Sequence, residues 1–96
     1  MKALALVKYT PQGAQAVLDG GGTVARRERN RAIFKEIGLE IHSYWMSAEP
    51  EWDVVFVLEG PEDPTRDARL QLHQWAGGDI AASSIIRLAD PEDVDS

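Results

Sequence analysis

Asp53 stands at the start of the most apolar run in the chain, directly before Val54-Val55-Phe56-Val57-Leu58. A carboxylate at the mouth of such a run can act as a general base or anchor a ligand. It can equally accept hydrogen bonds from the first N–H groups of the first helix, or from Thr10, and so tie a strand to that helix. We favour the structural role. Trp52, beside it, supplies a large ring with a polar edge.

A second candidate site is the segment Gly20-Gly21-Gly22-Thr23-Val24-Ala25-Arg26-Arg27. Its flexible backbone leads into a helix N-terminus with two arginines close by, which suits an anion. The segment has no Walker pattern and does not follow a parallel strand, so it is not a nucleotide-binding fingerprint. The alternative, which we favour, is a hinge followed by a solvated basic helix that pairs with Glu28 and with acidic groups of a partner subunit.

Aromatic residues and histidines complete the set. Four aromatic residues could line a pocket between sheet and helices, although core packing is the commoner role: Tyr9, Trp45, Trp52 and Trp75. The only histidines are His42 and His73, and the chain has no cysteine and no i,i+4 histidine pair, so we predict no metal site and no cofactor. His42 is opposite in strand phase to Trp45, and we expect it in a dimer cleft or as a polar surface residue.

Alternating and helical patterns predict six elements in the order β-α-β-β-α-β. Thr10 and Pro11 are expected to begin the first helix as N-cap and first residue, and the Gly20–Gly22 run bends it or divides it in two. Asp63 and Pro64 begin the last helix in the same way. The expected strands are 2–9, 39–46, 52–59 and 79–88, and the helices lie within 11–37 and 64–76.

The spacing of the apolar residues assigns faces to these elements. In strand 39–46, Ile41 and Trp45 are expected to share one face, with Tyr44 on the other. Strand 52–59 is apolar on both faces, which is typical of a strand covered on both sides. Two further rows are expected to share a face each: Ala68, Leu72, Trp75 and Ala76 on the last helix, and Ile80, Ala82, Ser84, Ile86 and Leu88 on the last strand.

With right-handed crossovers, this order gives an α+β, ferredoxin-like βαββαβ fold, a four-stranded antiparallel sheet with both helices on one face. Strand 52–59 is expected near the middle, beside the first strand. The other sheet face needs a cover, and a second copy of the chain is the simplest one. We therefore predict a homodimer packed sheet to sheet. The domain is expected at 1–89, followed by an acidic tail at 90–96.

Composition limits the classes of partner that we expect this chain to bind. The formal net charge is −6, which argues against a nucleic-acid partner, and Asp90, Glu92, Asp93 and Asp95 contribute much of it. No apolar run reaches the roughly 18–20 residues of a spanning helix, and the N-terminal Ala-Leu-Ala-Leu-Val is too short for a signal peptide. We expect a soluble, cytoplasmic protein without a membrane partner.

Three stretches carry a resemblance to a known family: KYTPQGAQAVLDGGGTVARRE, EIGLEIHSYWM and EPEWDVVFVLEGPED. Together they resemble the GYD domain family over nearly the whole chain. Its pattern is matched at Tyr9, Thr10, Gly13, Gly21, Arg26 or Arg27, and Asp53. Trp52 stands where the family motif has its tyrosine. The resemblance implies a ferredoxin-like, dimeric α/β-barrel type of fold and no established activity.

Three functions remain open. The first is a dimeric module that binds a small, anionic ligand near the Trp52-Asp53 strand start. The second is a cofactor-free enzyme of isomerase or monooxygenase type, acting on a small aromatic or keto substrate. The third is a purely structural assembly unit. A cavity containing Asp53 or a histidine would favour the enzyme, and a filled core the assembly unit. The candidate ligand-binding residues are Tyr9, Thr10, Arg26, Arg27, His42, Trp52 and Asp53.

Overall fold

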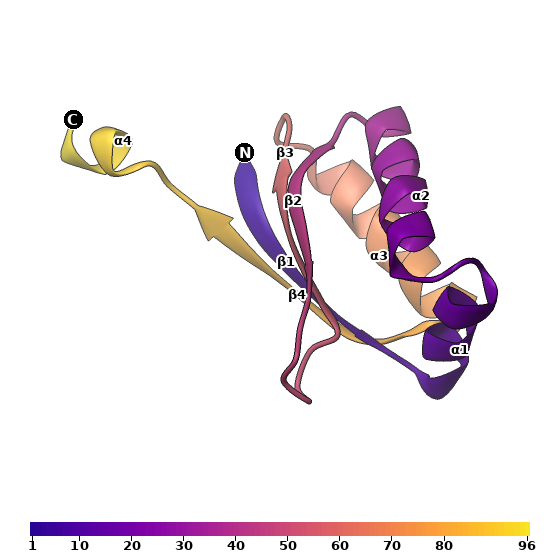
Figure 1. Cartoon of the computed structure of the whole chain (residues 1–96). Helices are drawn as coiled ribbons and strands as arrows, with labels where there is room; N and C mark the ends of the chain where they lie inside the picture. Colours follow the sequence, from indigo (N-terminus) through magenta and orange to yellow (C-terminus); the bar gives the residue numbers. More distant parts are fainter.

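A computed structural model describes all 96 residues and has four strands and four helices. In chain order they are β1 (Lys2–Tyr9), α1 (Pro11–Asp19), α2 (Thr23–Glu36), β2 (Glu40–Met46), β3 (Val54–Glu59), α3 (Pro64–Gly77), β4 (Ile80–Leu88) and α4 (Pro91–Asp95) (Figure 1). The predicted α+β class is confirmed. The glycine run separates two helices, α1 and α2, because Gly21 and Gly22 take positive φ angles of 101° and 92° that other residues avoid.

The four strands form one antiparallel sheet in the order β2-β3-β1-β4. β1 therefore pairs with β3 on one side and β4 on the other, which places β3 beside the first strand, as expected. Ala5 lies opposite Phe56 of β3 and Ile85 of β4. This central position fixes the end of β1, where the candidate residue Tyr9 is the last strand residue and Thr10 follows it.

One face of the sheet carries the core. Phe34 from α2 and Leu70 from α3 both pack against the same cluster of strand residues, so these two helices cover the same face (Figure 1). The rings of Phe34 and Phe56 lie 5.7 Å apart in a tilted arrangement. Burying such a ring is worth about 1.5–3 kcal/mol. The buried strand residues are Ala3, Ala5, Val7, Ile41, Val54, Phe56 and Leu58.

An irregularity in β2 changes which residues share a face. Ile41 pairs with Leu58 and Ser43 with Val57, so one extra residue, His42, lies between the two pairs. A single extra residue reverses the alternation from that point on. Tyr44 therefore shares the core face with Ile41, and Trp45 lies on the opposite face, 69% exposed. The prediction that Ile41 and Trp45 share a face is wrong.

The row predicted for β4 is interrupted in the same way. Tyr9 pairs with Ile80, but the preceding Lys8 pairs with Ala82, which leaves Ala81 as the extra residue. Ile80 consequently packs against the core, whereas Ala82, Ser84 and Ile86 lie on the open face of the sheet.

The orientation of α3 also departs from the prediction. Most of its expected apolar stripe faces outward: Leu72 is 71% and Trp75 45% exposed, and the helix has no fully buried residue. Of that stripe, Ala68 alone borders the space between α3 and the sheet. Leu70 and Gln74 face the sheet instead. The side of α3 toward the sheet borders open space and includes polar residues such as Gln74, so apolar spacing does not mark it.

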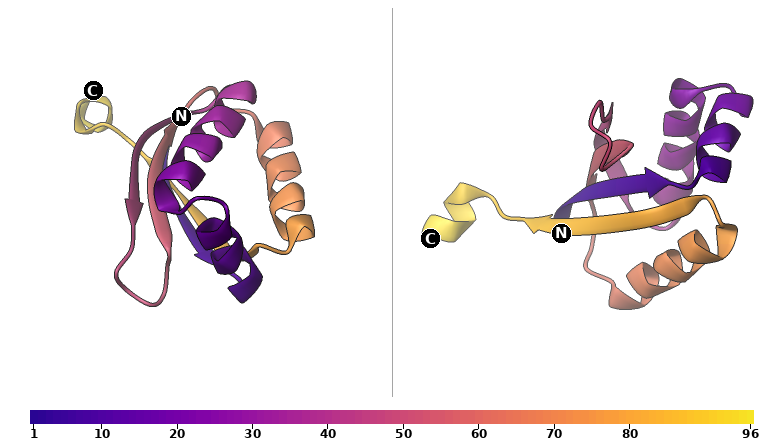
Figure 2. Two further views of the ribbon diagram at one scale, coloured as in Figure 1. Left: turned by 45° about the vertical axis from the view of Figure 1, so that its right-hand side comes forward. Right: turned by 90° about the horizontal axis from the view of Figure 1, so that it is seen from below.

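The acidic tail contains a short helix, α4, that the sequence patterns do not predict. Beyond Leu88 the chain leaves the sheet, and α4 lies apart from the other helices in every view (Figures 1 and 2). None of the helices has the length and apolar content needed to cross a membrane.

Candidate functional site

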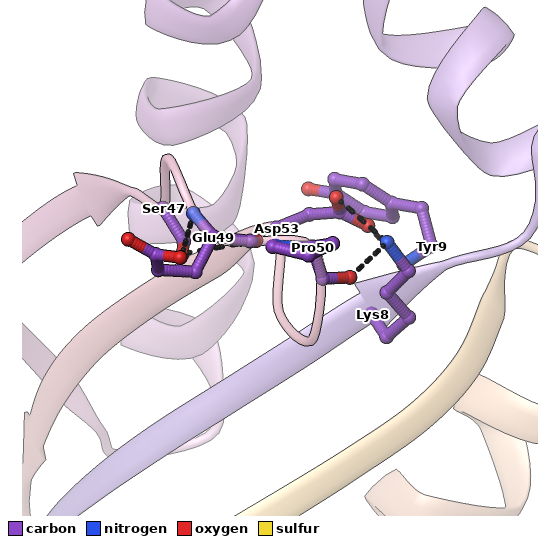
Figure 3. A network of polar contacts seen from close by, with 6 residues as sticks. All are labelled: Lys8, Tyr9, Ser47, Glu49, Pro50 and Asp53. Carbon is purple, nitrogen blue, oxygen red and sulfur yellow. Dashed lines mark hydrogen bonds and ion pairs between the residues drawn. The ribbon is translucent and has the colours of Figure 1, made fainter.

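Asp53 lies where the β2–β3 connection meets the end of β1 (Figure 3). Its Oδ2 accepts the backbone N–H of Tyr9 at 2.8 Å, and its Oδ1 lies 3.3 Å from Nζ of Lys8. The backbone N–H of Asp53 donates to the carbonyl of Val7 at 2.9 Å. Asp53 therefore ties the hairpin to β1. Its donors are Tyr9 and Lys8, not the N–H groups of α1 or Thr10, so the expected bonding partners are corrected.

The β2–β3 connection is held by three further hydrogen bonds. Nζ of Lys8 donates to the carbonyl of Pro50 at 3.0 Å, and the N–H of Ser47 donates to the carbonyl of Asp53 at 2.9 Å. The hydroxyl of Ser47 accepts the N–H of Glu49 at 3.1 Å (Figure 3). The loop before β3 is thus held from both sides.

Thr10 serves the local fold. Its Oγ1 accepts the N–H of Gly13 at 3.0 Å, which makes it the N-cap of α1, and its hydroxyl donates to the carbonyl of Gly78 at 2.7 Å. The N–H of Thr10 donates to the carbonyl of Asp79 at 2.9 Å. A Cβ at Gly13 would lie 2.1 Å from that same carbonyl oxygen. The β1–α1 turn and the α3–β4 turn are therefore interlocked.

Beside this junction lies a cavity of about 280 Å³ between the sheet, α2 and α3. Apolar side chains such as Phe34, Phe56 and Leu70 form part of its wall. Convergent polar groups on an apolar wall are typical of small-molecule sites. The polar residues come from five different elements or their ends, and they include Tyr9, Arg26, Asn30, Tyr44, His73, Gln74 and Asp79.

Two polar residues of α2, Arg26 and Asn30, stand one helical turn apart and so face the cavity together. Nδ2 of Asn30 donates to the hydroxyl of Tyr44 at 3.2 Å. The Tyr44 ring stacks on Phe56 with centroids 5.5 Å apart, which fixes the position of its hydroxyl. The cavity wall is thus organised by direct contacts between β2, β3 and α2.

Arg26 is the cation of this cavity. It is half-buried and takes part in none of the ion pairs of the structure. Of the other arginines of α2, Arg27 and Arg31 both pair with Glu28, at 2.8 Å and 3.3 Å, whereas Arg29 is exposed and unpaired. Asp79 also lines the wall, and its Oδ1 lies 3.4 Å from Nε2 of Gln12. Arg26 is therefore free to meet an acidic group from outside the chain.

Tyr9 provides a neutral hydroxyl. Burial raises the pKa of the Tyr9 phenol well above its ordinary value of 10.0, and the neighbouring Tyr44 adds to this rise. A phenol with a raised pKa keeps its proton at neutral pH. Tyr9 can thus donate a hydrogen bond into the cavity.

The other sequence candidates lie elsewhere. Arg27 is paired with Glu28, and His42 contacts Glu59 through Nε2, outside the cavity. Trp52 is half-buried in the loop before β3 and does not line the cavity. Of the four aromatic residues expected in a pocket or in the core, Tyr9 alone lines this cavity, while Trp45 and Trp75 are exposed. No cluster of His, Asp and Glu has the arrangement of a metal site.

Five polar residues of the cavity were not among the predicted ligand-binding set: Asn30, Tyr44, His73, Gln74 and Asp79. The i,i+4 spacing of Arg26 and Asn30 was a usable signal, because it places both on one helix face. Tyr44 could not be assigned to the cavity from sequence because the extra residue at His42 reverses the face on which it lies. His73 could not be assigned because α3 is oriented differently from the prediction.

Residues 4–96 match the sequence profile of a protein family described as the GYD domain, a match that extends through the acidic tail. Neither the curated proteins nor the solved structures include a match to the chain.

Proposed function

The chain belongs to the GYD domain family, and from this premise we propose that it is a binding module for a small organic anion, held in the cavity beside Tyr9 and Arg26. Membership brings no activity with it, so the proposal depends on the site itself. The cavity also counts against a purely structural assembly unit, for which a filled core is expected.

The unpaired Arg26 carries this proposal. A guanidinium in a partly buried, concave site attracts a carboxylate more strongly than one in open water, and it can bind both oxygens at once. The neutral hydroxyl of Tyr9 and the amide of Asn30 supply further hydrogen bonds. Asp79 on the same wall favours a ligand with a single negative charge over a polyanion.

The test compares two arginines of α2 with benzoate as the probe. Arg26→Gln removes the cation at the cavity, and Arg29→Gln removes an exposed arginine that does not line it. We expect benzoate to bind the wild-type chain and the Arg29 variant equally and the Arg26 variant at least about tenfold more weakly, since a charge-assisted bond is worth about 1.5–3 kcal/mol. Equal weakening in both variants, or no binding to any of the three, would count against the proposal.

Native mass spectrometry of freshly purified protein is a complementary measurement. A retained acid that is present on the wild type and absent from the Arg26 variant would identify the natural ligand directly.

A second candidate function is proton transfer on a small keto acid. His73 lines the same cavity as the protonated Tyr9 phenol. Enolisation requires a base and a neutral hydrogen-bond donor in one site, because the donor stabilises the developing oxyanion. NMR in D₂O would follow exchange of the α-protons of 2-oxobutyrate. Exchange that is lost in His73→Gln while binding persists would support this function, and an unchanged exchange rate would refute it.

We also propose that the chain forms a ferredoxin-like homodimer packed sheet to sheet. The open sheet face, comprising Leu4, Leu6, Trp45, Val55, Val57 and Ile86, is covered by no helix. Trp45 and Ile86 are 69% and 48% exposed. A contiguous apolar face of this kind is typical of an interface, and a second copy presents the same face to it. Light scattering should give twice the chain mass at micromolar concentration.

A further inference from the structure

A second, larger cavity of about 530 Å³ lies between α3 and the strands β1 and β4. Its floor includes Ala3 and Ala5 in the middle of the sheet, with Ser83 opposite Val7 on β4. Larger β-branched or aliphatic residues at these positions would occupy part of this space, which is open to solvent where Ala68 and Ile85 are exposed. The neighbouring β3 carries larger residues, Phe56 and Leu58, in the same layer. Small residues under α3 therefore leave an apolar chamber.

The two cavities are neighbours. Five residues line both of them: Val7, Phe34, Phe56, Leu70 and Gln74. Together the cavities fall within the roughly 300–1,000 Å³ that small-molecule sites occupy. A ligand bound at the polar cavity thus has apolar space directly beside it.

The charges are distributed unevenly between the two cavities. Asp67 and Arg87 are the charged residues that line the larger one, and each has a partner of its own: Arg66 at 3.1 Å and Glu62 at 3.3 Å. The unpaired cation, Arg26, lines only the smaller cavity. The site thus offers one acid-binding end and one apolar end.

We infer that the ligand is an amphipathic monoanion, with its acidic head at Arg26 and an acyl or aryl group in the chamber over Ala3 and Ala5. This inference rests on the proposed anion site and adds the chemistry of the rest of the ligand. The area of the ligand removed from water then determines its affinity, at about three- to fourfold per methylene.

The experiment is an NMR titration of the ¹⁵N-labelled chain with butyrate, hexanoate, octanoate and decanoate. We expect affinity to rise by about three- to fourfold per methylene until the chamber is full. Ala68→Leu on α3 inserts a larger side chain at a chamber-lining position that is itself exposed, so folding is not at risk. Ala76→Leu is the matched control on the same helix, because Ala76 is exposed and lines neither cavity.

The Ala68 variant should bind butyrate like the wild type but gain little from longer chains, whereas the Ala76 control should keep the full increase. Arg26→Gln should weaken every acid by a similar factor. Affinity that depends on Arg26 but not on chain length would overturn this inference and leave the anion site standing. If none of the acids binds, both fail. A chain-length dependence that survives Ala68→Leu unchanged would place the tail outside the chamber and overturn the inference as well.

Discussion

The backbone N–H of Tyr9 donates to Oδ2 of Asp53 at 2.8 Å, across 44 positions of the chain. Tyr9 is the last residue of β1, and its side chain lines the polar cavity. The Asp53 carboxylate therefore binds the backbone of a residue whose side chain lines the cavity, and it fixes the end of β1. This relationship assigns Asp53 a positioning role and makes its effect on the fold measurable.

Replacing Asp53 should cost more stability than replacing its ion-pair partner. Asp53→Ala removes a charge-assisted hydrogen bond from the Tyr9 N–H and should lower the free energy of unfolding by about 1.5–3 kcal/mol. Lys8→Met breaks an ion pair whose side chains are 36% and 31% exposed, worth about 0–1 kcal/mol, and also the bond to the Pro50 carbonyl. Urea denaturation measures both, with Glu51→Gln in the same loop as a control near zero. Equal losses at Asp53 and Lys8 would show that the contacts of Lys8, not the Tyr9 bond, carry the effect.

Two glycine-to-alanine changes should differ in their effect on the free energy of unfolding. At Gly13 a Cβ would lie 2.1 Å from the carbonyl oxygen of Asp79, so the backbone must move, at a cost of about 1–3 kcal/mol or more. At Gly77, the last residue of α3, a Cβ meets nothing within 4 Å. Alanine there should be neutral or stabilising by up to about 1 kcal/mol. Thermal unfolding followed by circular dichroism compares the two, and a neutral Gly13→Ala would contradict the interlocked turns.

Stability should fall at alkaline pH through Tyr9. In the unfolded chain its phenol ionises near 10.0, whereas burial raises the pKa in the folded state. Above that pH the folded state holds a proton that the unfolded state has lost, so the contribution of Tyr9 is complete below about pH 10 and declines as the pH rises. Between about pH 9 and pH 11, the wild type should therefore lose more stability than Tyr9→Phe. A similar loss in both proteins would assign the decline to other groups.

The ionisation of Tyr9 is directly observable. In Tyr44→Phe it is the only tyrosine, and the absorbance of its phenolate near 295 nm should emerge only well above pH 10. An ordinary titration midpoint would mean that the Tyr9 hydroxyl is solvated.

Two exposed tryptophans lie on different faces of the molecule and can locate the proposed interface. Trp45 lies on the open sheet face and Trp75 on the outer side of α3. Trp45→Glu puts a charge into the interface of the proposed dimer and should yield a monomer in size-exclusion chromatography with light scattering. Trp75→Glu should leave the dimer intact. Dissociation by the Trp75 change alone would place the interface on α3 instead.

Local signals predicted much of the fold. Regular alternation gives β1 its observed bounds, and the pairs Thr10-Pro11 and Asp63-Pro64 begin α1 and α3 as expected because capping depends on neighbouring residues only. The two errors in assigning strand faces, in β2 and β4, have another origin. An extra residue in a strand, such as His42, has no signature in sequence, and it is visible only against the partner strand.

The site was predicted less completely because it is assembled across distant segments. Tyr9 and Arg26 could be chosen from residue type and place in the chain. Tyr44 and His73 join them only through strand register and the rotation of α3, which are set by packing partners far away in sequence. Asp53 was identified as important from its place at the strand start, whereas its hydrogen-bond partner Tyr9 is known only from the sheet register.

The loose packing of α3 on the sheet has a consequence for amide hydrogen exchange. This helix has no fully buried residue, whereas α1 and α2 each bury at least one side chain. Segments with few buried contacts open at lower free energy than the whole domain unfolds. Backbone amides of α3 should therefore exchange with solvent faster than those of β1 and β3, and an occupant of the cavities beneath should slow them first. The amide exchange rates of α3 would then report whether a ligand occupies the cavities, without any label on the ligand.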